Sequence, residues 1–232
     1  MLNNYKNTHR WLIIPFVVIM LGFAPSYWLK LGEVPFRQHL HGITATLWFI
    51  VLIAQPYLVT HGKAKQHRFY GMLALFVAGG VALSAAGAIP YNFQGSMSAA
   101  ARYGLSLIDV VVVSGFSVAV IMAIRTAKDI DSHARWMIST VFWAVMPGLF
   151  RLIMITTAII SQGDFPDWVT TPGVIITCGL LNIAILSFLM IRDRHTHPAY
   201  LTAACGSIVF FLAPFASGWQ WWRNLADAVF TV

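Results

Sequence analysis

Residues 104–124 read GLSLIDVVVVSGFSVAVIMAI, and Asp109 is the one ionisable side chain among them. A helix needs about 20 mostly apolar residues to cross the roughly 30 Å hydrocarbon core of a bilayer, so this stretch is long enough to span it. The run is continuously apolar and does not alternate with polar residues. It therefore predicts a transmembrane helix and not a strand of a membrane barrel.

Six further stretches of the chain have the same character and length. The seven predicted spans are Trp11–Leu29, His39–Thr60, Phe69–Ile89, Gly104–Ile124, Trp136–Ile160, Trp168–Ile191 and Ala199–Gly218. The predicted fold class is therefore all-α, a polytopic bundle of seven transmembrane helices. Residues 38–160 are expected to form a four-helix core, and the spans 11–29, 168–191 and 199–218 are expected to lie outside it.

The composition agrees with a chain that lies in lipid throughout its length. Hydrophobic residues make up 58% of the 232 residues and charged residues 10%, against roughly 25% charged in soluble domains. The longest loops, residues 90–103 and 163–167, are too short for a soluble domain. We therefore expect one integral membrane domain over residues 1–232. The two cysteines, Cys178 and Cys205, lie in apolar runs and predict no disulfide framework.

The formal net charge of +7 is explained by membrane topology and not by binding of nucleic acid. Cytoplasmic loops carry an excess of Lys and Arg, and with the N-terminus in the cytoplasm the cytoplasmic side holds ten of these residues against four on the other side. The ten are Lys6, Arg10, Lys63, Lys65, Arg68, Arg125, Lys128, Arg135, Arg192 and Arg194. The predicted partner of the chain is thus the lipid bilayer, with the N-terminus inside and the C-terminus outside.

An internal repeat occurs where two loops lead into the next helix. The segments 65–72 (KQHRFYGM) and 131–137 (DSHARWM) both place a polar loop before His, then Arg within two residues, an aromatic residue and Met. Two spans separate the copies, so both copies face the same way across the bilayer. This predicts a parallel duplication of a two-helix hairpin, spans 2–3 and spans 4–5, about an axis along the membrane normal.

The repeat brings two histidines to equivalent places. In a bundle of spans 2–5 the third and fifth spans lie on a diagonal, so His67 and His133 are expected to approach each other at one depth. The positive end of each helix dipole disfavours imidazolium, and neutral imidazole is the form that binds metals. We therefore expect both residues to bind a cofactor, either haem b or a transition-metal ion such as Cu, Zn or Fe. The alternative is that both are interfacial residues that bond carbonyls or lipid headgroups.

A second polar group is expected toward the outer face. His41, Asp109 and Arg151 lie inside predicted spans, where a charge costs at least about 2.5 kcal/mol and normally faces the bundle interior. Arg151 follows His133 by five helical turns, so both are expected on one face of the fifth span. Asp109 and Arg151 are expected to pair near His41 and to act as catalytic or proton-handling residues. The alternative is a structural ion pair with an incidental histidine.

Three motifs carry a resemblance to known membrane proteins. These are His39-Leu40-His41-Gly42 with Trp48 and Gln55, His67-Arg68-x-x-Gly71, and Asp129-x-x-x-His133-x-Arg135-Trp136-Met137. Together, over about residues 38–155, they resemble functionally uncharacterised bacterial polytopic membrane proteins with paired histidine-bearing hairpins. The hairpins are also similar to a family implicated in assembly of haem-copper oxidases and, more distantly, to four-helix b-type cytochromes.

The resemblance has consequences for the site and the location. Two-haem cytochromes need histidine pairs on both sides of the membrane, whereas here the outer partner on the fourth span is Asp109. One haem or one metal is therefore implied in place of two. The same resemblance implies the bacterial inner membrane, with the C-terminus in the periplasm.

Three functions are compatible with these patterns. The first is a redox or metal-handling protein that binds its cofactor through His67 and His133 and handles protons or a small ligand at the outer residues. The second is a small proton-coupled transporter that uses Asp109, Arg151 and His41. The third is a non-catalytic assembly subunit that works within a larger membrane complex or as a homo-oligomer. The sequence leaves open whether the protein is an enzyme.

Overall fold

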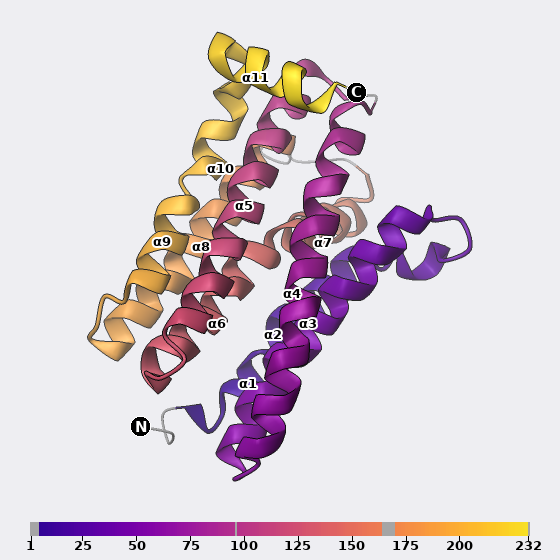
Figure 1. Cartoon of the computed structure of the whole chain (residues 1–232). Coiled ribbons are helices and arrows are strands. Elements are labelled where there is room, and N and C mark those ends of the chain that lie inside the picture. The colour runs from indigo at the N-terminus through magenta and orange to yellow at the C-terminus, as the bar shows by residue number, and fades with distance from the viewer. Residues whose placement is uncertain (1–4, 96, 164–169, 232) are drawn as a thin grey trace.

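The structure is a computed structural model that describes residues 5–95, 97–163 and 170–231. Every regular element in these ranges is a helix (Figure 1). The α-helices are α1 (Thr8–Trp11), α2 (Ile13–Phe23), α3 (Phe36–Thr60), α4 (Ala64–Phe93), α5 (Ala99–Arg125), α6 (Ile130–Ala144), α7 (Met146–Ile160), α8 (Thr171–Asp193), α9 (Pro198–Gly206), α10 (Val209–Leu212) and α11 (Gln220–Phe230). Two 3₁₀ helices, η2 (Trp28–Lys30) and η3 (Ala213–Gly218), complete the set.

Five helical segments in the described residues are long and apolar enough to cross a membrane. They are α3, α4, α5, α8 and the segment Pro198–Gly218, which comprises α9, α10 and η3. The pair α6 and α7 would make a sixth span, with a bend of 42° between the two helices. The prediction of an all-α membrane bundle is thus confirmed, with five or six spanning helices in place of the seven expected.

The first predicted crossing is the one whose helix is shorter than a full span. The predicted span Trp11–Leu29 forms a helical segment over Thr8–Phe23, which is shorter than a full span. Pro25 follows two residues later and has no backbone N–H to continue the helical hydrogen bonds. The start of the predicted span Trp168–Ile191 lies outside the described residues, and its helix is described from Thr171.

The bend between α6 and α7 has an identifiable cause. Val145 separates the two helices, and Pro147 is the second residue of α7. A proline inside a helix removes one hydrogen bond and pushes its ring against the preceding turn. The predicted fifth span is therefore broken into two straight pieces that point in different directions.

Four helices form the centre of the bundle. Contacts run in cyclic order from α3 to α4, α5 and α6, and α6 returns to α3. The buried indole of Trp48 on α3 donates to the hydroxyl of Thr140 on α6 at 3.2 Å, and its ring lies edge-on to Phe116 of α5 at 5.3 Å. One side chain thus joins three of the four helices in their common core.

The other helices cover this centre. Helix α9 packs against α5 and α6, α10 packs against α5, and α8 packs behind them against α7, α9 and α10, while α2 packs on α7. Helix α11 lies across one end of the bundle (Figure 1). There the indole of Trp222 donates to the carbonyl of Tyr103 at 2.9 Å, and the hydroxyl of Tyr103 donates to Asp227 at 2.9 Å.

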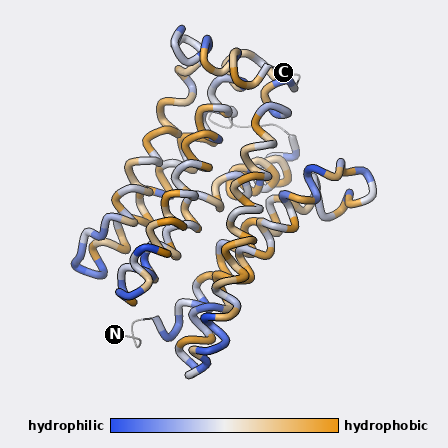
Figure 2. Tube along the Cα trace, viewed as in Figure 1, coloured by the Kyte–Doolittle hydropathy of each residue, from blue (hydrophilic) through white to orange (hydrophobic). Residues whose placement is uncertain are grey.

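Apolar and polar residues separate along the bundle as a bilayer requires. Figure 2 shows hydrophobic residues along the helices and hydrophilic residues concentrated at the turns. Successive long helices run in opposite directions, so the N-terminal segment and the turns after α3, α5 and α8 gather at one end (Figure 1). The end with most Lys and Arg is thus also the end where α4 and α6 begin.

Helices α2 and α7 approach each other at two glycines. A Cβ atom on Gly22 would lie 2.1 Å from the carbonyl oxygen of Gly148, and a Cβ on Gly148 would lie 2.9 Å from the Cα of Ile19. Small residues at a crossing let two backbones come close, which is a common way for helices to associate in lipid. Gly22 and Gly148 therefore hold the short α2 against α7.

We expect Gly22→Ala to destabilise the protein by about 1–3 kcal/mol, because the added methyl forces the two backbones apart. Thermal unfolding in detergent micelles measures this loss. Gly79→Ala is the matched control, since a Cβ at Gly79 meets nothing within 4 Å. Equal stability of the two variants would show that the α2–α7 crossing contributes nothing.

Candidate functional site

The structure brings His67 and His133 together. Their ring centroids are 6.3 Å apart, with an angle of 87° between the ring planes. Each histidine is the fourth residue of its helix, His67 in α4 and His133 in α6. Each backbone N–H closes the first turn, on the carbonyl of Lys63 at 3.0 Å and of Asp129 at 2.9 Å. The two rings thus have equivalent places in the two helices.

Nδ1 of each ring has a hydrogen-bond partner in the protein. Nδ1 of His133 lies 2.8 Å from the carbonyl oxygen of Ala123. A carbonyl only accepts hydrogen bonds, so this nitrogen carries the proton and donates. In the neutral ring Nε2 of His133 is then the atom with a free lone pair.

The partner of His67 is Gln55, a buried residue of α3. With the amide oriented so that both of its ends have partners, its nitrogen donates to Nδ1 of His67 and, at 3.2 Å, to the carbonyl of the same residue. Its oxygen accepts from the backbone N–H of Gly71 at 3.1 Å. In this orientation Nε2 of neutral His67 carries the proton. Turning the amide would place the proton on Nδ1 and free Nε2.

The chemistry open to the pair follows from these contacts. With Gln55 as described, the pair offers one Nε2–H donor and one Nε2 acceptor, which suits a hydrogen bond between the neutral rings. With the amide turned, the pair offers two lone pairs, which suits a metal ion. Hydrogen bonds of Nδ1 to a carbonyl or an amide are the usual support for a ligating histidine.

The predicted outer group is not assembled in the way that the spacing indicated. His41 bonds Ser84 of α4, with 3.1 Å between Nδ1 and the hydroxyl oxygen. Asp109 has neither a hydrogen bond nor an ion pair through its side chain within the described residues. Arg151 donates to the carbonyl of Pro147 at 3.1 Å and lies over the ring of Phe23, 4.3 Å from its centroid. No ion pair joins Asp109 to Arg151 in the described residues, so their direct pairing stays a prediction.

The bend before α7 explains the difference. A straight helix would put Arg151 on the same face as His133, five turns away, but the 42° bend lies between them. Helix α7 packs against α2 and not along α5. Its arginine consequently reaches an aromatic ring of α2, while the Arg151 charge still acts on His41 and Asp109 at longer range.

A charged network at the end of the bundle where α6 begins was missed in the sequence. Arg135, which is 9% exposed, donates from Nε to Asp131 at 2.7 Å and from Nη1 to Asp193 at 2.7 Å. Its guanidinium also lies over the ring of Tyr200. The arginine therefore ties α6 to the end of α8 and to α9. The i, i+4 spacing of Asp131 and Arg135 was visible in the sequence, whereas the contact with Asp193 was not.

The N-terminal segment joins the same network. The hydroxyl of Tyr5 donates to the carboxylate of Asp131. Burial, together with this contact, raises the pKa of Tyr5, so the phenol stays protonated and keeps donating. The network thus fastens four segments of the chain at one end of the bundle.

A second missed group lies in the core between the last helices. The amide nitrogen of Asn182 donates to the hydroxyl of Ser207 at 2.8 Å and to the carbonyl of Phe142 at 3.3 Å. Both Asn182 and Ser207 are almost fully buried. They connect α8 to α6 and to the end of α9, which is a structural role.

Comparisons with protein-family models, with curated proteins and with solved structures find no match to this chain. The function is therefore argued from the contacts of the candidate site.

We expect Arg135→Ala to lower the free energy of unfolding by about 3 kcal/mol, because two partly buried carboxylates lose their shared cation. The thermal midpoint of the protein in micelles measures the loss. Arg192→Ala is the control, since Arg192 also bonds Asp193 but is largely exposed, and a surface pair contributes about 0–1 kcal/mol. Similar midpoints for both variants would contradict a structural role of the network.

The stability of this end of the bundle is expected to fall in acid because of His197. Burial, followed by the charges of Arg135 and His195, lowers the pKa of His197 below its ordinary 6.5, while Asp131 and Asp129 oppose the shift. As the pH falls, His197 in the unfolded chain therefore binds a proton at a higher pH than His197 in the folded chain. The stabilisation is present above pH 6.5 and is lost as the pH falls through the lowered pKa of the folded state.

His197→Asn tests this expectation, because an amide oxygen can still cap the N–H of Ala199, which His197 Nδ1 caps at 3.2 Å. The variant should lose less stability than the parent between about pH 7 and pH 5. The thermal midpoint measured across this range gives the comparison. Parallel curves for the two proteins would exclude His197 as the titrating group.

Proposed function

We propose that this chain is an integral membrane protein that handles a transition-metal ion through His67 and His133. The observation that carries the proposal is the separation of 6.3 Å between the two ring centroids. Two imidazole nitrogens bound to one ion at about 2 Å each put the ring centroids roughly 6.4 Å apart when the ion lies between them in a line. In a tetrahedral arrangement the same bonds give roughly 5.2 Å.

The donor set favours copper(I) among the metals considered. Within the described residues no group of three or more His, Cys, Asp and Glu surrounds one point, so the pair would supply two ligands. Copper(I) accepts two ligands in a line, whereas structural zinc sites use four protein ligands and catalytic ones three. Imidazole also suits copper well. A further position on the ion would stay open for exchange with a donor or acceptor of copper.

Haem b, the other expected cofactor, receives less support from the same geometry. The ring separation also suits two axial ligands of one iron, but a haem needs a flat cavity that reaches past both rings. Two surface cavities of the described residues, one beside Tyr57 and one beside Ser84, contact neither His67 nor His133. An optical spectrum of protein purified in detergent separates the two cofactors directly.

The proposal includes the finer parts of the topology. Counting Thr8–Phe23 as a crossing and α6 with α7 as one span gives seven crossings, with the N-terminus in the cytoplasm and the C-terminus in the periplasm of a bacterial inner membrane. The equivalent places of His67 and His133 in their helices support a duplicated hairpin. The outer residues His41, Asp109 and Arg151 would then handle protons or a small ligand, and the observed hydrogen bond of His41 to Ser84 fits that role better than an ion-pair site.

Purified protein is expected to bind one equivalent of copper(I) in competition with a chelator of known affinity. His67→Ala and His133→Ala should each lower the affinity by at least about 100-fold, since each removes one of two ligands. Gln55→Leu should change the affinity less than either histidine variant, because Leu removes both the bond that opposes the ligating tautomer of His67 and the acceptor that would support it. The titration is followed by metal analysis after gel filtration.

His195→Ala is the matched control, because His195 is exposed at the same end of the bundle. It should bind copper(I) as the parent does. X-ray absorption should find two nitrogen ligands in the parent protein. Binding that survives the loss of both His67 and His133, or a colourless protein that takes up neither copper, zinc nor haem, would refute the proposed function.

A further inference from the structure

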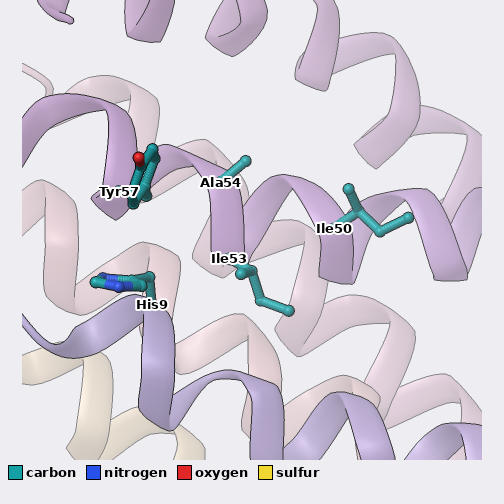
Figure 3. Close-up of a pocket in the computed structure, with 5 residues that line it drawn as sticks. All are labelled: His9, Ile50, Ile53, Ala54 and Tyr57. Atoms are coloured by element: carbon teal, nitrogen blue, oxygen red, sulfur yellow. The ribbon is translucent and has the colours of Figure 1, made fainter. Parts of the chain in front are cut away.

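A groove separate from the histidine pair lies between α1 and α3. Its walls are formed by His9, Ile50, Ile53, Ala54 and Tyr57, and its volume is about 320 Å³. Figure 3 shows His9 and Tyr57 together at one end, with Ala54, Ile53 and Ile50 following along α3. The groove is thus apolar along its length and is closed at one end by the rings of His9 and Tyr57.

This ring end lies at the last turn of α3. The ring of Tyr57 stacks on His61 with centroids 4.0 Å apart, and His9 meets both rings edge-on, at 5.5 Å from Tyr57 and 6.2 Å from His61. The ammonium of Lys63 lies 5.9 Å from the centroid of Tyr57. Aromatic and basic side chains therefore meet at the level where a membrane helix leaves the hydrocarbon.

The aliphatic wall extends from there into the membrane. Ile50, Ile53, Ala54 and Tyr57 follow one another at helical spacing, so they form one stripe of α3. From Tyr57 to Ile50 the stripe descends about 10 Å at 1.5 Å per residue. Ile50 is 47% exposed and Tyr57 is 41% exposed, so this stripe faces the lipid.

We propose that this groove binds one anionic phospholipid. The phosphate would lie by Lys63 and the imidazoles of His9 and His61, and one acyl chain would lie along Ile53 and Ile50. Charge complementarity supports this occupant. The ammonium of Lys63 lies beside the ring end of the groove, and within the described residues no carboxylate is among the lining residues or the rings stacked on them. A basic surface next to a membrane span attracts anionic lipid by about 1 kcal/mol per Lys or Arg.

The proposal is tested by native mass spectrometry of the delipidated full chain in detergent. Phosphatidylglycerol and phosphatidylcholine with identical acyl chains are added in equal amounts. We expect one phosphatidylglycerol to be retained at least fivefold more strongly than phosphatidylcholine. Lys63→Gln should reduce this preference at least threefold. Equal retention of the two lipids by the parent protein would overturn the proposal.

A larger side chain in the groove tests whether an acyl chain binds along Ile53 and Ile50. Ile53→Trp should lower retention of phosphatidylglycerol at least fivefold. Phe188→Trp should leave it unchanged, because Phe188 is an exposed residue of α8 (61% exposed) outside the groove. If Ile53→Trp fails to fold, Ala54→Leu gives the same test with a smaller side chain. Retention that survives both groove variants, or glycerol phosphate that competes as well as the lipid, would show that no acyl chain is bound here. Copper binding through His67 and His133 should be the same in all of these variants.

Discussion

Hydrocarbon offers no water to a polar group, and the rest of this structure depends on that constraint. Each buried donor or acceptor has to find its partner within the protein or incur a large cost. Trp48 therefore donates to Thr140, and Asn182 to Ser207. The same requirement gathers Arg135, Asp131 and Asp193 into one network at the end of the bundle. Helix packing thus follows these few polar contacts as much as it follows side-chain volume.

Local pattern was sufficient for the features that repeat along one helix. The length of an apolar run predicts a span, and the matching motifs around His67 and His133 predict that both rings lie at the same depth of their helices. The spans from α3 to α5 were predicted to within five residues at either end. Arg151 was placed as if the helix ran straight from His133, whereas the structure bends by 42° before α7.

Contacts between distant segments could not be predicted in this way. Gln55 belongs to one of the motifs that carry the resemblance, but its bonds to His67 and Gly71 depend on how α3 and α4 cross. The pairing of Arg135 with Asp193 joins residues 58 positions apart, and a single sequence contains no signal for that distance. Tyr5 likewise became part of the network only because the N-terminal segment folds back onto α6.

The amide of Gln55 connects the two chemistries open to the histidine pair. In one orientation the amide nitrogen donates to Nδ1 of His67, and the ring proton lies on Nε2. In the other orientation the amide oxygen accepts a hydrogen bond from Nδ1–H, and Nε2 is free for a metal. The first orientation has a second support, since Gly71 N–H donates to the amide oxygen. Metal binding at His67 would therefore have to compete with this bond and move the ring proton from Nε2 to Nδ1. The neutral ring keeps its one proton in this exchange, so metal affinity would depend on pH only in the acid range where the rings become imidazolium and must lose a proton before they bind.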